Sequence, residues 1–160
     1  MYEFTPKSGQ TKADLYRDLH DAAVALTADE PDGIANMANV AALIAQFLPD
    51  LNWAGFYRAV GDTLVLGPFI GKPACIRIPM GRGVCGTAAA TGLTQRVEDV
   101  HAFPGHIACD SASRSELVVP IMRDGHAIAV IDLDSPELAR FDADDARGIE
   151  ALAAALSHRV

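Results

Sequence analysis

Three cysteines are the side chains of this sequence best suited to covalent chemistry. Cys75 opens an apolar run, Cys85 lies in a glycine-rich turn that leads into a helical pattern, and Cys109 lies in a long polar segment near histidines. The positive end of a helix dipole or a nearby imidazolium lowers the pKa of a thiol and makes it a better nucleophile. Cys85 and Cys109 are therefore both candidate nucleophiles, although a free cysteine is more often a small buried apolar residue.

Three carboxylic acids form a second candidate cluster. Asp132 and Asp134 end an apolar run two residues apart, so their side chains lie on one face of a strand. Glu116 begins the run that we expect to pair with this strand. Three acids that meet at one end of a sheet are unfavourable unless one keeps its proton or a cation neutralises them, and an amino acid's ammonium group is such a cation. Ordinary turn chemistry after Asp134 is the alternative interpretation.

Two aromatic residues form a third candidate feature. Trp53 and Tyr57 flank Gly55 in a β-like run, so all three lie on one face of a strand. We expect the glycine to leave space above the sheet, which would make the aromatic rings the wall of a ligand site. A core face is the alternative interpretation, because aromatic side chains are common in cores.

Neither a metal site nor a nucleotide site is expected. His106 and Cys109 have a spacing that zinc could accept, but no Cys-x-x-Cys or His-x-x-x-His pair accompanies them. Residues 81–87 are rich in glycine but lack the spacing of a phosphate-binding loop.

The composition indicates one acidic domain with a core of its own. The chain has 160 residues, of which 50% are hydrophobic, and a net charge of −8. This charge disfavours nucleic acids and anionic membranes as partners. No segment approaches the ~18–20 apolar residues of a membrane span, and the first residues do not resemble a signal peptide, so we expect a cytoplasmic protein.

The periodicity of apolar residues predicts the elements that must position these side chains. We expect two N-terminal helices within residues 11–48 (11–26 and 31–48), a sheet with active-site loops over 52–135, and a C-terminal helix over 142–159. Turn residues divide the middle region into six strands and a short helix near 86–90, and Asp124-Gly125 marks a hairpin. The strands are expected at 53–60, 63–69, 75–78, 94–97, 116–122 and 127–134. The predicted class is α+β, with one domain over 1–160 and a mostly antiparallel sheet flanked by helices.

Taken together, the motifs resemble the free methionine-(R)-sulfoxide reductase family, a single-domain branch of the GAF fold. The resemblance begins at residue 52 and reaches the C-terminal helix, whereas the first ~50 residues carry no matching motif. Counterparts of all three family cysteines separate the chain from ordinary GAF sensor domains. The motifs are NWAGFY (52–57), LGPF (66–69), GKPAC (71–75), GRGVCGTA (81–88), DVHAFPGHIACD (99–110), SRSE (113–116) and DLDS (132–135).

The resemblance implies thiol-dependent reduction of free L-methionine (R)-S-oxide to methionine, without a metal or organic cofactor. A thiolate attacks the sulfoxide sulfur, and the resulting sulfenic acid condenses with a second thiol to a disulfide, which thioredoxin or a similar dithiol reduces. Cys109 is the expected nucleophile and Cys75 the expected resolving cysteine. Cys85 is the second resolving cysteine or, by the helix-terminus argument, an alternative nucleophile.

The resemblance also implies the substrate contacts. Glu116, Asp132 and Asp134 would bind the ammonium group and protonate the sulfoxide oxygen, and Trp53 and Tyr57 would hold the S-methyl group. The alternative function is a GAF-type small-molecule or redox sensor without turnover. The apolar stripes of the N-terminal helices exceed what one sheet would cover, which makes a homodimer possible.

Overall fold

The computed structural model describes residues 4–107 and 110–160. The α+β class and the mostly antiparallel sheet expected from the sequence are confirmed. In chain order the elements are α1 (Lys12–Leu26), α2 (Gly33–Phe47), β1 (Trp53–Val60), β2 (Thr63–Gly71), β3 (Arg77–Pro79), α3 (Gly83–Thr91), β4 (Gln95–Val97), the 3-10 turn η1 (Val100–Ala102), β5 (Ser115–Arg123), β6 (His126–Ser135) and α4 (Ala143–Leu156).

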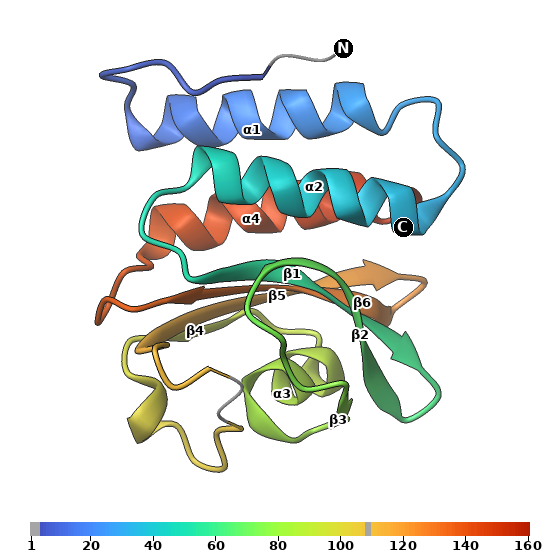
Figure 1. Ribbon diagram of the computed structural model, residues 1–160. Coiled ribbons are helices and arrows are strands. Elements are labelled where there is room, and N and C mark those ends of the chain that lie inside the picture. The colour runs from blue at the N-terminus through green and yellow to red at the C-terminus, as the bar shows by residue number, and fades with distance from the viewer. Residues whose placement is uncertain (1–3, 108–109) are drawn as a thin grey trace.

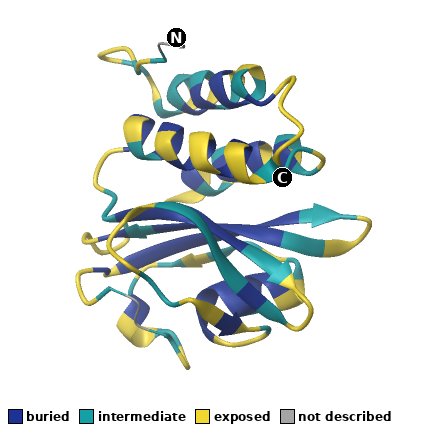
Figure 2. Ribbon diagram, turned by 45° about the vertical axis from the view of Figure 1, so that its right-hand side comes forward, coloured by how far each residue is buried: buried dark blue, intermediate teal, exposed yellow. Residues whose placement is uncertain are grey.

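A six-stranded antiparallel sheet of order β3-β2-β1-β6-β5-β4 divides the molecule into two sides (Figure 1). On one side α2 and α4 cover the sheet and α1 lies on top of them, and on the other side α3 and the loop before β5 cover it. Each side has its own cluster of buried apolar residues, and buried residues follow the strands while exposed ones lie in the loops and on the outer face of α2 (Figure 2). The candidate residues lie on the side of α3, where the smaller cluster leaves room for polar groups.

Side-chain caps set the starts of the helices. Thr11 caps α1 by accepting a hydrogen bond from the Asp14 backbone N–H. The α2 helix begins at Gly33 rather than at Pro31, because the Asp32 carboxylate accepts the first free N–H groups. Asp142 caps α4 through a capping box, and this helix ends at Leu156, three residues before the expected end.

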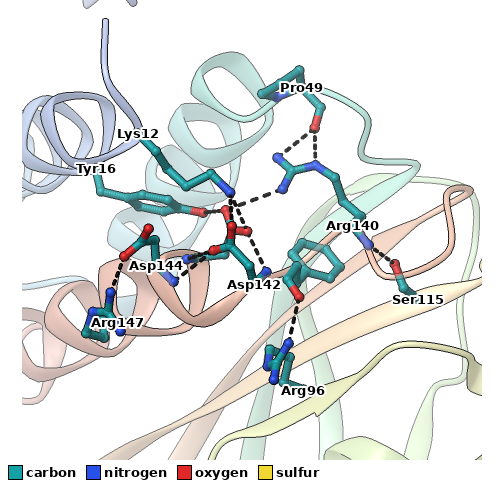
Figure 3. A network of polar contacts seen from close by, with 11 residues as sticks. Lys12, Tyr16, Pro49, Arg96, Ser115, Arg140, Asp142, Asp144 and Arg147 are labelled. Atoms are coloured by element: carbon teal, nitrogen blue, oxygen red, sulfur yellow. Dashed lines mark hydrogen bonds and ion pairs between the residues drawn. The ribbon is translucent and has the colours of Figure 1, made fainter.

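A buried carboxylate joins α4 to α1. Asp145 is fully buried and accepts hydrogen bonds from the Tyr16 hydroxyl at 2.7 Å, Lys12 Nζ at 2.9 Å and Arg140 at 3.3 Å. Figure 3 shows this network continuing through Arg140, whose backbone N–H donates to Ser115 Oγ at 3.3 Å, next to the predicted site residue Glu116. Most apolar residues of α1 and α2 are buried within this packing, but Ile34 of α2 is 45% exposed. A homodimer stays a prediction.

The segment around Cys75 differs from the prediction. The strand expected at 75–78 begins only at Arg77, so Cys75 lies in the loop between β2 and β3. This loop is held by a backbone hydrogen bond from the Leu66 N–H to the Ile76 carbonyl at 3.0 Å and by the Tyr57 hydroxyl, which donates to the Cys75 carbonyl at 3.0 Å. No described helix is long and apolar enough to cross a membrane.

Candidate active site

The three acids come together as the predicted hairpin requires. In the β5–β6 pair Glu116 lies opposite Asp134, and Asp132 follows on the same face of β6. The neighbouring strand β1 places Trp53 opposite Asp134 and Gly55 opposite Asp132. Acids and aromatic residues therefore share the face of the sheet that α3 and the loop cover.

Two small cavities border these side chains. The first, of about 30 Å³, lies between the acids, the start of α3 and the loop before β5. The second, of about 10 Å³, lies beside Trp53 and Tyr57, and Asp110, Asp132 and Asp134 line both. About 10–15 Å³ holds one water molecule, so in this conformation the cavities admit a few waters. A ligand the size of an amino acid enters only when one of the walls moves.

Burial raises the pKa of all three acids. For Glu116 and Asp132 burial is the main cause and the charge of Asp134 adds to it, so the pKa of each lies well above that of an ordinary carboxyl. Burial raises the pKa of Asp134 to about 6, against a hydrogen bond from Ser113 that favours its charged form. Oδ1 of Asp132 is buried without a hydrogen-bond partner among the described residues. The cluster thus combines proton donors with an unused acceptor.

Cys85 lies in the first turn of α3, where the sequence places it at a helix start, but its environment opposes ionisation. Its Sγ lies 4.0 Å from Glu116 Oε1, and the side chain is buried. Burial, followed by the charges of Asp132 and Glu116, raises the pKa of this thiol well above its usual value. The helix-dipole argument predicts the opposite sign, because it considers only local sequence and the two acids come from other strands.

The other two cysteines belong to the loops that border the site. Cys75 is in a disulfide bond and is half-buried. Cys109 lies outside the described residues. Residue His106 precedes it in the same loop, and its Nε2 is 3.7 Å from Glu116 Oε2. Burial, followed by the charge of His101, lowers the pKa of the His106 imidazole.

The aromatic wall is a stack of three rings. Trp53 stacks on Tyr57 and on Phe69, with ring centroids 5.9 Å and 5.2 Å apart. Gly55 does not leave the open space that the sequence suggests. A Cβ at this position would clash with Phe69 Cβ and lie 2.8 Å from both Phe69 Cα and the Trp53 ring, so the glycine lets β2 and that ring approach the strand.

Sequence reasoning missed three residues of the site. Phe69 closes the aromatic stack, Asn52 Nδ2 donates to Ser113 Oγ at 3.0 Å, and Ser113 hydrogen-bonds the Asp134 carboxylate. All three lie in motifs that carry the family resemblance, but polar and apolar periodicity does not single them out.

One described group has side-chain atoms close enough to share a metal ion. The ligand atoms of Cys85, Glu116 and Asp132 lie within 4.8 Å of one another. Burial raises the pKa of Glu116 and of Asp132, and protonation of either acid lowers the repulsion between them without a metal ion. The absence of a metal cofactor remains a prediction.

Comparisons with known proteins show the family of the chain. The GAF domain family model matches residues 20–160. The free methionine-R-sulfoxide reductase of Escherichia coli is 52% identical over 91% of this chain and 88% of its own length. The enzyme of the same name from Saccharomyces cerevisiae is 42% identical over 91% of this chain and 86% of its own length.

A solved structure extends the comparison to three dimensions. The free methionine-R-sulfoxide reductase of Neisseria meningitidis, solved in complex with its substrate, is 48% identical and superimposes with a TM-score of 0.94. The match covers 99% of this chain and 95% of that one. The chain therefore belongs to the free methionine-R-sulfoxide reductase family of GAF-domain proteins.

Proposed function

We propose that the protein reduces free methionine (R)-sulfoxide to methionine. The observation that carries this proposal is the cluster of three buried acids with raised pKa values, next to a stack of aromatic rings. Reduction of a sulfoxide needs a proton for the departing oxygen, and a free amino acid offers an ammonium group that pairs with a carboxylate. The E. coli and yeast relatives carry the name of this activity.

The chemistry needs two thiols and no resident cofactor. The Cys109 thiolate attacks the sulfoxide sulfur, the oxygen passes to the cysteine as a sulfenic acid, and methionine leaves reduced by two electrons. The Cys75 thiol then attacks the sulfenic acid, which forms a disulfide and releases water. A dithiol such as thioredoxin reduces this disulfide by thiol exchange.

The three acids have two roles, proton donation and binding of the ammonium group, and their pKa values indicate which acid has which role. Burial raises the pKa of Glu116 and of Asp132, which favours their protonated forms, and one of them donates a proton to the sulfoxide oxygen. Asp134, with a pKa of about 6, is mostly ionised at pH 7 and receives the ammonium group. Trp53 and Tyr57 hold the S-methyl group against their rings.

The environment of Cys85 favours Cys109 as the attacking residue. A thiolate is the nucleophilic form, and burial beside two acids keeps Cys85 protonated. Cys85 then serves as a second resolving cysteine, in the lining of the larger of the two cavities.

Chiral analysis of racemic free methionine sulfoxide tests the proposal. The reduced protein is incubated with dithiothreitol, and then with thioredoxin, as wild type, Cys109→Ser and Cys85→Ser. We expect the R epimer alone to disappear with the wild type and Cys85→Ser, and neither epimer to disappear with Cys109→Ser. Turnover by Cys109→Ser and none by Cys85→Ser would make Cys85 the nucleophile. If the wild type consumes neither epimer, binding without turnover would identify a sensor.

A further inference from the structure

We propose that the ion pair between Lys72 and Asp110 positions the two cysteine-bearing loops for disulfide formation. The inference rests on the proposed function, because it concerns the step in which the Cys75 thiol attacks a sulfenic acid on Cys109. It adds Lys72 as a positioning residue, which lines neither cavity of the candidate active site.

The ion pair joins the two loops at points close to the reacting cysteines. Lys72 Nζ lies 3.4 Å from Asp110 Oδ1. Lys72 is three residues before Cys75, and Asp110 directly follows Cys109 in the chain. A contact between these side chains therefore restrains the backbone next to both thiols.

Each partner is in turn fixed to the sheet. On the side of Cys109, Asn52 at the start of β1 donates from Nδ2 to Asp110 Oδ2 at 3.2 Å, and the Ala112 N–H donates to Asp110 Oδ1 at 2.9 Å. On the side of Cys75, Trp53 Nε1 donates to the Lys72 carbonyl at 3.2 Å. Asn52 and Trp53 are neighbours in the chain, so both loops are held by one point of the sheet.

The side chains of Lys72 and Asp110 differ in exposure, and this difference indicates which of the two is held in place by the protein. The Asp110 side chain is only 8% exposed and that of Lys72 is 70% exposed. The hydrogen bond from Ala112, followed by those from Asn52 and Lys72, lowers the pKa of Asp110, so it stays charged. Asp110 is the fixed anion. Lys72 binds it from the exposed side and so restrains the loop between β2 and β3, which carries Cys75.

The ion pair is present while Cys75 is in a disulfide bond, and we expect its effect on the rate in the reduced protein, where Cys75 is a thiol. Disulfide formation within one chain depends on the effective concentration of one thiol near the other, and a restraint beside both raises it. Attack on the sulfoxide precedes this step and needs only one cysteine. Loss of the ion pair should therefore slow the second step and leave the first unchanged.

Single-turnover experiments with Lys72→Met test this expectation. Reduced protein is mixed with free methionine (R)-sulfoxide in the absence of reductant, and methionine and the disulfide are followed by quenching and mass spectrometry. We expect methionine to form at the wild-type rate and the disulfide to form about two- to fivefold more slowly, the range for a partly exposed ion pair. Dimedone, which traps sulfenic acids, should label the variant more.

Salt and a matched variant separate this role from a general structural one. Salt near ~1 M screens an exposed pair, so it should slow disulfide formation in the wild type and leave Lys72→Met unaffected. Lys7→Met removes another exposed lysine, 3.7 Å from Asp18, and should change neither step. Asp110→Asn should slow the disulfide step, and Lys72→Met should add nothing in that background.

The outcomes distinguish this inference from the proposed function. Equal disulfide rates in Lys72→Met and the wild type, or equal slowing by Lys72→Met in the presence and absence of Asp110, would overturn the positioning role alone. A wild-type protein that releases no methionine would overturn the proposed function, and the inference with it.

Discussion

Replacement of Asp134 by asparagine should make the protein more stable, and the gain should depend on pH. The pKa of Asp134 is raised from 3.8 to about 6, mainly by burial. The folded protein therefore keeps this proton over a pH range in which the unfolded chain has lost it. The stability that this carboxyl contributes is fully present below about pH 4 and is lost as the pH rises through about 6.

The expected gain follows from the size of this shift. A shift of about 2 pKa units at 1.36 kcal/mol per unit corresponds to ~3 kcal/mol once the carboxyl is ionised in both states. Asparagine has nearly the same shape, keeps an oxygen that can accept the Ser113 hydrogen bond, and carries no charge. We expect the free energy of unfolding to rise by ~3 kcal/mol at pH 8 and by about half as much at pH 5.

Urea unfolding of the reduced wild type and Asp134→Asn at both pH values measures the gain. Asp29→Asn, at an exposed position, is the control and should give the same small difference at pH 5 and pH 8. An equal gain for Asp134→Asn at the two pH values, or a loss at pH 8, would refute the reasoning. Turnover should fall in Asp134→Asn, because the amide cannot pair with the ammonium group.

Three further substitutions test other parts of the structure. Glu116→Gln should lose turnover, because a proton donor to the sulfoxide oxygen is removed, while the reduced protein still reacts with iodoacetamide at Cys109; normal turnover would remove Glu116 from the site. Gly55→Ala should lower the free energy of unfolding by about 1–3 kcal/mol and change the near-UV circular dichroism, because the new Cβ displaces the Trp53 ring. Asp145→Ala should cost about 3–5 kcal/mol in urea unfolding, because it leaves the charges of Lys12 and Arg140 without their buried partner. An unfolding free energy within error of the wild type would contradict either of the last two expectations.

The sequence predicts those parts of the site that depend on period and turn chemistry. Asp132 and Asp134 are two residues apart in a strand, and the Asp124-Gly125 turn sets the pairing that brings Glu116 opposite Asp134. The two-residue period and the hairpin suffice to place three acids on one face. Most strand positions follow from the same signals.

Properties that depend on distant segments do not follow from local patterns. The pKa of Cys85 is raised because β5 and β6 bring Glu116 and Asp132 against the start of α3, and no local pattern around residue 85 contains this contact. The space above Gly55 depends on the rotamer of Trp53 and on Phe69 of the next strand. Packing between elements decides both properties.

A hydrogen bond from Trp53 couples the fluorescence of the protein to the loop that carries Cys75. Trp53 is the only tryptophan of the chain, and its indole N–H donates to the Lys72 carbonyl in the loop that carries Cys75. Rearrangement of this loop, when the cysteine changes its bonding, alters the polarity around a single fluorophore. Intrinsic fluorescence should therefore follow the oxidation and reduction of the protein in real time, without a label, and each intermediate that moves this loop should have its own emission.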